Sequence, residues 1–133
     1  MATAEQRNHA RSYLKKSMEY LESADANLVA GRYTPAAGDA IHAGISAKDA
    51  IVTVLTGSTG KSKDHAVAAR ELRQVLAKRP EAATAERALR ALIASNGDVE
   101  YGTDLVTAAK AEPLVRRART LVELAIAIVR LGA

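Results

Sequence analysis

Three histidines and two nearby lysines are the side chains of this sequence best suited to acid–base or phosphate chemistry. Imidazole exchanges protons near neutral pH, and the chain holds His9, His42 and His65. His65 follows Lys61 and Lys63, whose ammonium groups would contact a phosphate as point charges. No side chain of the sequence can be assigned as a nucleophile that acts with these groups. A structural role is therefore favoured for each histidine, and His42 is expected at the edge of the core.

The loop before His65 carries part of a phosphate-binding pattern. Residues 55–62 read Leu-Thr-Gly-Ser-Thr-Gly-Lys-Ser. The full pattern places a glycine five residues before the second glycine, where this chain has Leu55. Such a loop also follows a strand, whereas the residues before it have helical spacing. A solvated linker is the favoured interpretation.

Two further polar regions are candidates for binding. Arg70 and Arg73 begin a basic region that extends to residue 90 and offers possible phosphate contacts, although a solvated face with local ion pairs is favoured. No aromatic residue lies nearby for base stacking, so RNA binding is a weak expectation. Residues 95–102 are rich in turn formers and gather the polar side chains Asn96, Asp98, Glu100 and Tyr101.

Composition argues against metal, cofactor and membrane functions. The chain has no cysteine, and no two histidines have metal-ligand spacing on one helix, so we expect neither a metal site nor a cofactor. The first residues contain no apolar run typical of a signal peptide. The stretch 121–131 is broken by Glu123 and Arg130 and is too short to span a bilayer. We expect a cytoplasmic protein whose net charge of +4 permits an acidic partner.

The apolar pattern predicts one all-α domain over residues 1–133, an antiparallel up-and-down bundle of about five helices. The chain is 48% hydrophobic but only 3% aromatic, so its core must consist of Ala, Leu, Ile and Val. Helices are predicted at 3–30, 35–56, 65–78, 81–94 and 107–131. Thr3 and Gln6 form a predicted capping box, Gly31 ends the first helix, and Thr34 is predicted to cap the second. The small residues of that second helix place it at the centre.

The last helix is apolar over more than one face. Pro113 must either kink it or mark its true start. A helix that is apolar over most of its circumference is buried on several sides, and in so short a chain the second cover is expected to be another copy. A homodimer is therefore predicted, with the interface candidates Val115, Leu121, Val122, Ile126 and Val129.

Three stretches together resemble the HEPN family of small helical toxin–antitoxin and defence domains. They are Leu-Val-Ala-Gly-Arg-Tyr-Thr-Pro-Ala-Ala (28–37), Ala-Ile-His-Ala-Gly-Ile-Ser-Ala-Lys-Asp-Ala-Ile (40–51) and Gly-Lys-Ser-Lys-Asp-His-Ala-Val (60–67). The resemblance implies a dimerising bundle, often encoded beside an antitoxin or a nucleotidyltransferase-like partner. Many members are metal-independent ribonucleases that use an arginine followed, four to six residues later, by a histidine near the start of the last long helix.

This chain departs from the family at that motif. The corresponding residues 95–101 read Ser-Asn-Gly-Asp-Val-Glu-Tyr, with neither arginine nor histidine, and Asp98 and Glu100 would repel RNA phosphates. A non-catalytic interaction module that acts through dimerisation and partner binding is therefore expected, and the chain is more consistent with a binding protein than with an enzyme. One alternative is a ribonuclease toxin with a displaced active site around Lys61, Lys63 and His65. A second alternative is a phage or mobile-element accessory structural protein.

Overall fold

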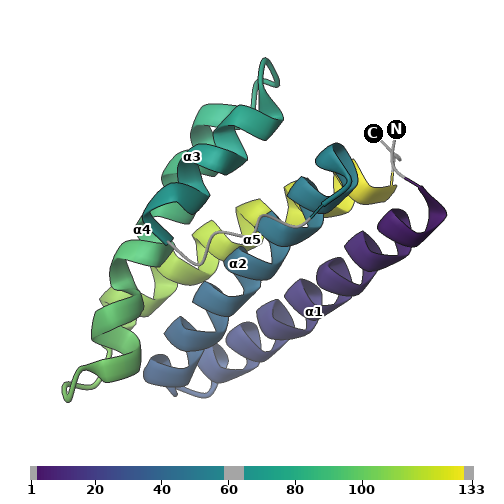
Figure 1. The fold of residues 1–133 in the computed structure, drawn as a ribbon. Coiled ribbons are helices and arrows are strands. Elements are labelled where there is room, and N and C mark those ends of the chain that lie inside the picture. Colours follow the sequence, from purple (N-terminus) through teal and green to yellow (C-terminus); the bar gives the residue numbers. More distant parts are fainter. Residues whose placement is uncertain (1–2, 59–64, 131–133) are drawn as a thin grey trace.

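Five α-helices account for most of the structure, a computed structural model that describes residues 3–58 and 65–130 (Figure 1). They are α1 (Ala4–Val29), α2 (Tyr33–Thr56), α3 (His65–Leu76), α4 (Ala82–Tyr101) and α5 (Ala108–Arg130). The described residues contain no strand, so the predicted all-α fold is confirmed. Within these two ranges, none of the helices has both the length and the apolar character needed to cross a bilayer.

The α1–α2 hairpin is closed by short-range signals. The capping box is confirmed, because Gln6 N donates to Thr3 Oγ1 at 3.1 Å and Thr3 N donates to Gln6 Oε1 at 2.7 Å. Gly31 has a φ of +77°, as expected of a residue that ends a helix. The predicted cap at Thr34 is wrong. α2 begins at Tyr33, with Arg32 as its N-cap residue.

α2 is the central helix of the bundle, and it packs on each of the other four helices. Its buried face is built largely from alanine, at Ala36, Ala37, Ala40, Ala43, Ala47 and Ala50. A Cβ atom placed on Gly44 would lie 2.5 Å from Leu92 Cδ1 of α4 and 3.3 Å from Leu121 Cδ1 of α5. The predicted close approach of other helices to α2 is therefore confirmed, and glycine is the residue that permits it.

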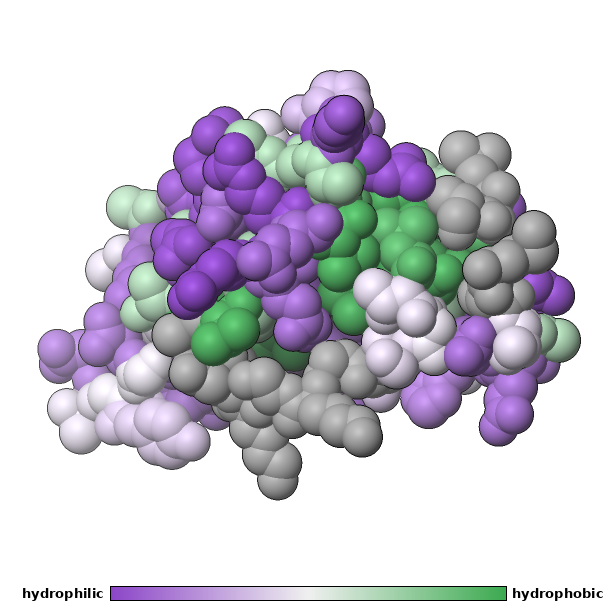
Figure 2. Space-filling view, turned by 45° about the horizontal axis from the view of Figure 1, so that its top comes forward, coloured by the Kyte–Doolittle hydropathy of each residue, from purple (hydrophilic) through white to green (hydrophobic). Residues whose placement is uncertain are grey.

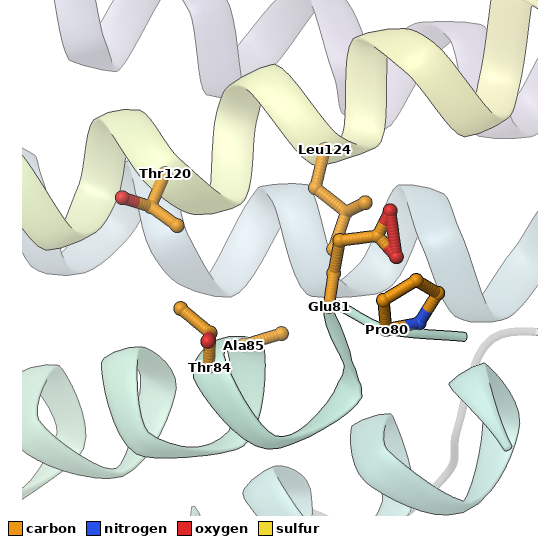
Figure 3. A pocket seen from close by; sticks show the side chains of 6 residues that line it. All are labelled: Pro80, Glu81, Thr84, Ala85, Thr120 and Leu124. Atoms are coloured by element: carbon orange, nitrogen blue, oxygen red, sulfur yellow. The ribbon is translucent and has the colours of Figure 1, made fainter. Parts of the chain in front are cut away.

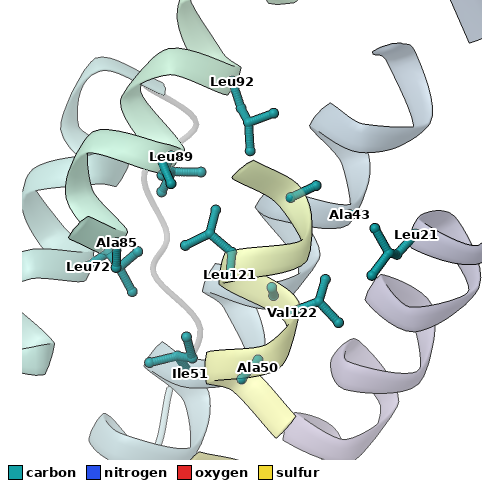
Figure 4. Packing of buried hydrophobic residues seen from close by; sticks show 14 of the residues in the cluster. Leu21, Ala43, Ala50, Ile51, Leu72, Ala85, Leu89, Leu92, Leu121 and Val122 are labelled. Carbon is teal, nitrogen blue, oxygen red and sulfur yellow. The ribbon is translucent and has the colours of Figure 1, made fainter. Parts of the chain in front are cut away.

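α5 fills the space between the α1–α2 hairpin and α4. Figure 4 shows Leu121 of α5 directed towards Leu89 and Leu92 of α4, and Val122 directed towards Leu21 of α1. These five side chains are all buried within a single chain. The several apolar faces of α5 are thus covered by α1, α2 and α4. This intramolecular cover removes the argument that a second copy must supply it.

Helix boundaries differ from the sequence prediction in three places. α3 ends at Leu76, and Ala77 follows with a φ of +54°. α4 continues to Tyr101 instead of ending near residue 94, because Val99 packs against the core and holds the turn formers before it in helical form. α5 begins at Ala108, so Pro113 lies inside the helix and does not mark its start. Because proline has no N–H group, Pro113 donates no hydrogen bond to the carbonyl of Ala109.

Candidate functional site

The two connections at one end of the bundle lie against each other. Val106 N, between α4 and α5, donates a hydrogen bond of 2.9 Å to Thr34 Oγ1 at the start of α2. This bond explains why the Thr34 hydroxyl does not cap α2. A groove of about 290 Å³ runs between the two connections, lined by residues 31–35 together with Leu105 and Val106. We call this region the bundle end.

The bundle end exposes large apolar side chains. Among the described residues, the exposed large hydrophobic side chains are Met18, Val29, Tyr101 and Leu105. Val29 is 90% exposed, and Tyr101 and Leu105 are each 84% exposed. Val29 ends α1, Tyr101 ends α4, and Leu105 lines the groove. Three of the four exposed side chains therefore belong to helix ends or connections at the bundle end, where a contiguous apolar patch would mark an interaction site.

Charged groups of both signs surround these apolar residues. Arg32 Nε donates to Asn27 Oδ1 at 2.9 Å, and Arg32 forms no ion pair with the described residues. Asp98 lies 3.5 Å from Lys110 Nζ and keeps 82% of its side chain exposed. Asp98 and Lys110 also line a second hollow of about 280 Å³, in which Asp104 lies. The bundle end therefore has an apolar centre and a charged border.

The residues that correspond to the family motif, 95–101, are helical and form the last turns of α4. Asn96 is partly buried, whereas Asp98, Glu100 and Tyr101 are exposed on the last turns of α4. Glu100 Oε1 lies 3.5 Å from His42 Nε2 of α2. The predicted turn over these residues is wrong, since the connection occupies only residues 102–107.

His42 links three helices at the surface. Its ring stacks on Tyr20 of α1, with centroids 5.1 Å apart, and its Nε2 atom faces Glu100 of α4. The sequence indicated the core edge for His42 but could not indicate Glu100, which is far away along the chain. Ser23, which faces α2 from α1, donates its hydroxyl to Asp39 Oδ2 at 2.6 Å. His42 therefore connects α1, α2 and α4 at the surface through Tyr20 and Glu100.

Of the four predicted phosphate-contact residues, Arg70 and Arg73 lie on α3 in the described part of the chain. Lys61, Lys63 and the side chain of His65 lie outside the residues whose side chains are described. Arg70 is exposed on α3. Arg73 Nη1 is bound to Glu86 Oε1 at 2.8 Å, and the other oxygen of Glu86 is bound to a second arginine. The hydrogen bond from Arg73 is the main reason why the pKa of Glu86 is lowered.

Four of the five predicted dimer-interface residues are buried by their own chain. These are Val115, Leu121, Val122 and Val129, and Ile126 is partly buried against the same core. A buried side chain cannot meet a second copy without unfolding the helix that carries it. Of the five predicted residues, Ile126 is therefore the one whose side chain remains partly exposed.

A buried charge cluster that the sequence did not indicate joins α2 to α3. Lys48 is only 6% exposed, and its Nζ atom lies 3.2 Å from Glu71 Oε1 and 3.6 Å from Asp49 Oδ1. Burial raises the pKa of the Asp49 carboxyl, and Lys48 opposes that rise. Glu71 Oε1 has no well-oriented hydrogen bond despite its closeness to the ammonium group. The sequence shows Lys48 only as a lysine among the alanines of α2, and this pattern does not indicate its contacts with Asp49 and Glu71.

A second groove lies between α4 and α5 at the opposite end of α4. It has a volume of about 370 Å³ and is lined by Pro80, Glu81, Thr84, Ala85, Thr120 and Leu124. Figure 3 shows Thr120 of α5 facing Thr84 and Ala85 of α4 across this groove, and Leu124 of α5 facing Glu81. Figure 2 shows one face of the molecule, on which hydrophobic residues reach the surface between hydrophilic ones.

No cluster of three or more histidine or acidic residues that could hold a metal ion occurs in the described part of the chain. No protein-family model, curated protein or solved structure matches this sequence. The HEPN resemblance thus rests on the three sequence stretches that carry it. The geometry itself offers apolar and charged contact surfaces.

Proposed function

We propose that this chain is a non-catalytic, HEPN-like interaction module of a toxin–antitoxin or defence system, acting through dimerisation and partner binding. The observation that carries the proposal is the exposure of Val29 and Leu105 beside an apolar groove at the bundle end. Complete burial of a valine or leucine side chain is worth about 1.5–3 kcal/mol. Covering both residues would therefore contribute substantially to the affinity of a complex.

The proposed partner is a small protein of the antitoxin or nucleotidyltransferase-like class, which is what the HEPN resemblance implies. A bound protein can fill the groove with an apolar side chain, pair with Arg32 in the groove and pair with Asp104 in the second hollow. The absence of catalysis is supported by residues 95–101, which lack the arginine and histidine of the family ribonucleases.

The test is a pull-down of the tagged protein from its native host, with any co-purifying protein and RNA identified. The affinity of the identified protein is then measured for the Val29→Asp, Leu105→Asp double variant. We expect that variant to lose binding, since two charges would enter the apolar centre of the contact. Met18→Asp is the matched control, because Met18 is an exposed apolar residue on the side of α1. Circular dichroism shows whether the variants keep their helices.

Two outcomes would overturn the proposal. One is an unchanged affinity of the identified protein for the double variant. The other is recovery of RNA with a cleaved end and no protein partner. That second result would instead favour the ribonuclease built around Lys61, Lys63 and His65.

A further inference from the structure

A stripe of side chains runs along the outward face of α4. Its members recur every three or four residues, which places them on one side of the helix. They are Thr84, Arg87, Ala91, Ala94, Asp98 and Tyr101. All of them are exposed except Ala91, which is half-buried. The opposite side of α4 supplies Leu89 and Leu92 to the core.

The spacing of this stripe is the same from either end. From Thr84 the steps are three, four, three, four and three residues, and from Tyr101 the steps backwards are identical. If a second copy of α4 lies antiparallel with its Tyr101 beside Thr84, every later position also coincides. Arg87 then faces Asp98 of the second copy, and Ala91 faces Ala94 of the second copy.

We propose that two copies of this chain pair antiparallel along α4, with Arg87 of each copy bound to Asp98 of the other. This proposal rests on the function proposed above, to which it adds the partner and the residues for dimerisation. The arrangement is two-fold symmetric, so each contact occurs twice and the assembly closes as a dimer. It leaves Val29 and Leu105 at the bundle end for a different protein.

The charges of the stripe suit a second copy better than they suit contacts within one chain. Arg87 donates to Thr84 Oγ1 over a long 3.4 Å and forms no ion pair with the described residues. Asp98 is 82% exposed and has only a 3.5 Å contact with Lys110. Arg90, one turn further, is already bound to Glu86 at 2.9 Å. Arg87 of one copy can therefore bind the exposed Asp98 of a second copy, in addition to the long contact that Asp98 makes with Lys110.

The apolar members of the stripe also fit the pairing. Ala91 and Ala94 lie near the symmetry axis, where side chains without bulk allow two helices to approach closely. Tyr101, exposed in one chain, comes to lie beside Thr84, next to the groove that Ala85 and Leu124 line. A tyrosine ring covered there buries its apolar body and keeps its hydroxyl at the rim. The stripe from Thr84 to Tyr101 extends about 25 Å at about 1.5 Å per residue.

The test uses Arg87→Glu and Asp98→Arg, with the dimer measured by sedimentation equilibrium of the full chain. In either single variant both pairs become like-charged, so we expect dimerisation to weaken by about tenfold or more. An equimolar mixture of the two variants restores both pairs. We therefore expect the mixture to form a heterodimer with the affinity of the original protein. Arg70→Glu is the matched control, since it makes the same charge change on α3 and should leave the dimer unaffected.

Three results would each overturn the pairing. They are an original protein that stays monomeric at micromolar concentration, single variants that dimerise like the original, and a mixture that fails to recover. Partner capture at the bundle end is measured on Arg87→Glu alone, because Asp98 belongs to the charged border of the bundle end whereas Arg87 does not. If the copies do not pair along α4 but the partner still binds at the bundle end, this arrangement alone is refuted. If the partner binds the Val29→Asp, Leu105→Asp variant with unchanged affinity, the proposed function is refuted.

Discussion

Replacing Gly44 with alanine is expected to destabilise the protein, although alanine is the better helix former. The gain in helix propensity is about 1 kcal/mol. Against it, the new Cβ would lie 2.5 Å from Leu92 Cδ1, inside a contact where Leu92 and Leu121 are both fully buried. Relieving such overpacking costs about 1–3 kcal/mol. The net expectation is a loss of about 1 kcal/mol in the free energy of unfolding.

Gly97→Ala is the matched control for this prediction. Gly97 also lies inside a helix, but a Cβ atom there meets nothing within 4 Å. The same propensity gain should therefore appear undiminished, as a stabilisation of about 1 kcal/mol. Urea denaturation followed by far-UV circular dichroism measures both variants. If Gly44→Ala stabilises the protein as much as Gly97→Ala does, Leu92 can move without cost, and the argument for a close approach at α2 is refuted.

Two further predictions concern the charged groups. Lys48→Met should lower the free energy of unfolding by about 3 kcal/mol, because two partly buried carboxylates lose their cation. Urea denaturation measures this loss. The double variant Lys48→Met, Glu71→Leu should recover part of the lost stability. Burial raises the pKa of Asp49, so its ionisation costs stability as the pH rises from 3.8 through its folded pKa. Asp49→Asn should therefore make the loss of stability on acidification steeper. Glu86→Gln should make that loss of stability shallower, because the lowered pKa of Glu86 stabilises the fold above pH 4.5. Unfolding curves between about pH 3 and pH 7 test both signs.

Local signals in the sequence were sufficient for the helix class and for the first hairpin. The capping box of Thr3 and Gln6 and the positive φ of Gly31 depend on residues close in sequence, and both are confirmed. Thr34 was assigned wrongly because its hydroxyl is bound by Val106 N, a contact between distant segments. The turn formers near residue 96 are likewise helical, because Val99 packs on the core. Tertiary contacts therefore decided the positions at which local preference failed.

The candidate surfaces were less accessible to sequence reasoning. The stripe along α4 could not be recognised while that helix was predicted to end near residue 94, since Asp98 and Tyr101 then belonged to a turn. The contact of His42 with Glu100 and that of Lys48 with Glu71 each join different helices. Exposure of Leu105 is a property of the folded surface and has no pattern in the sequence. The acidic and aromatic residues of 98–101 were nonetheless singled out as a cluster.

The hairpin of α1 and α2 has a consequence for the order of folding. Its two helices share the most extensive helix–helix contact of the fold and are joined by only residues 30–32. A short connection makes closure entropically inexpensive, and alanine loses no rotamer freedom when α2 is covered. Contacts local in sequence form fastest, so this hairpin is expected to be the folding nucleus. α5, which comes last in the chain, packs on both α1 and α2. Its docking would then be the late step that completes the native fold.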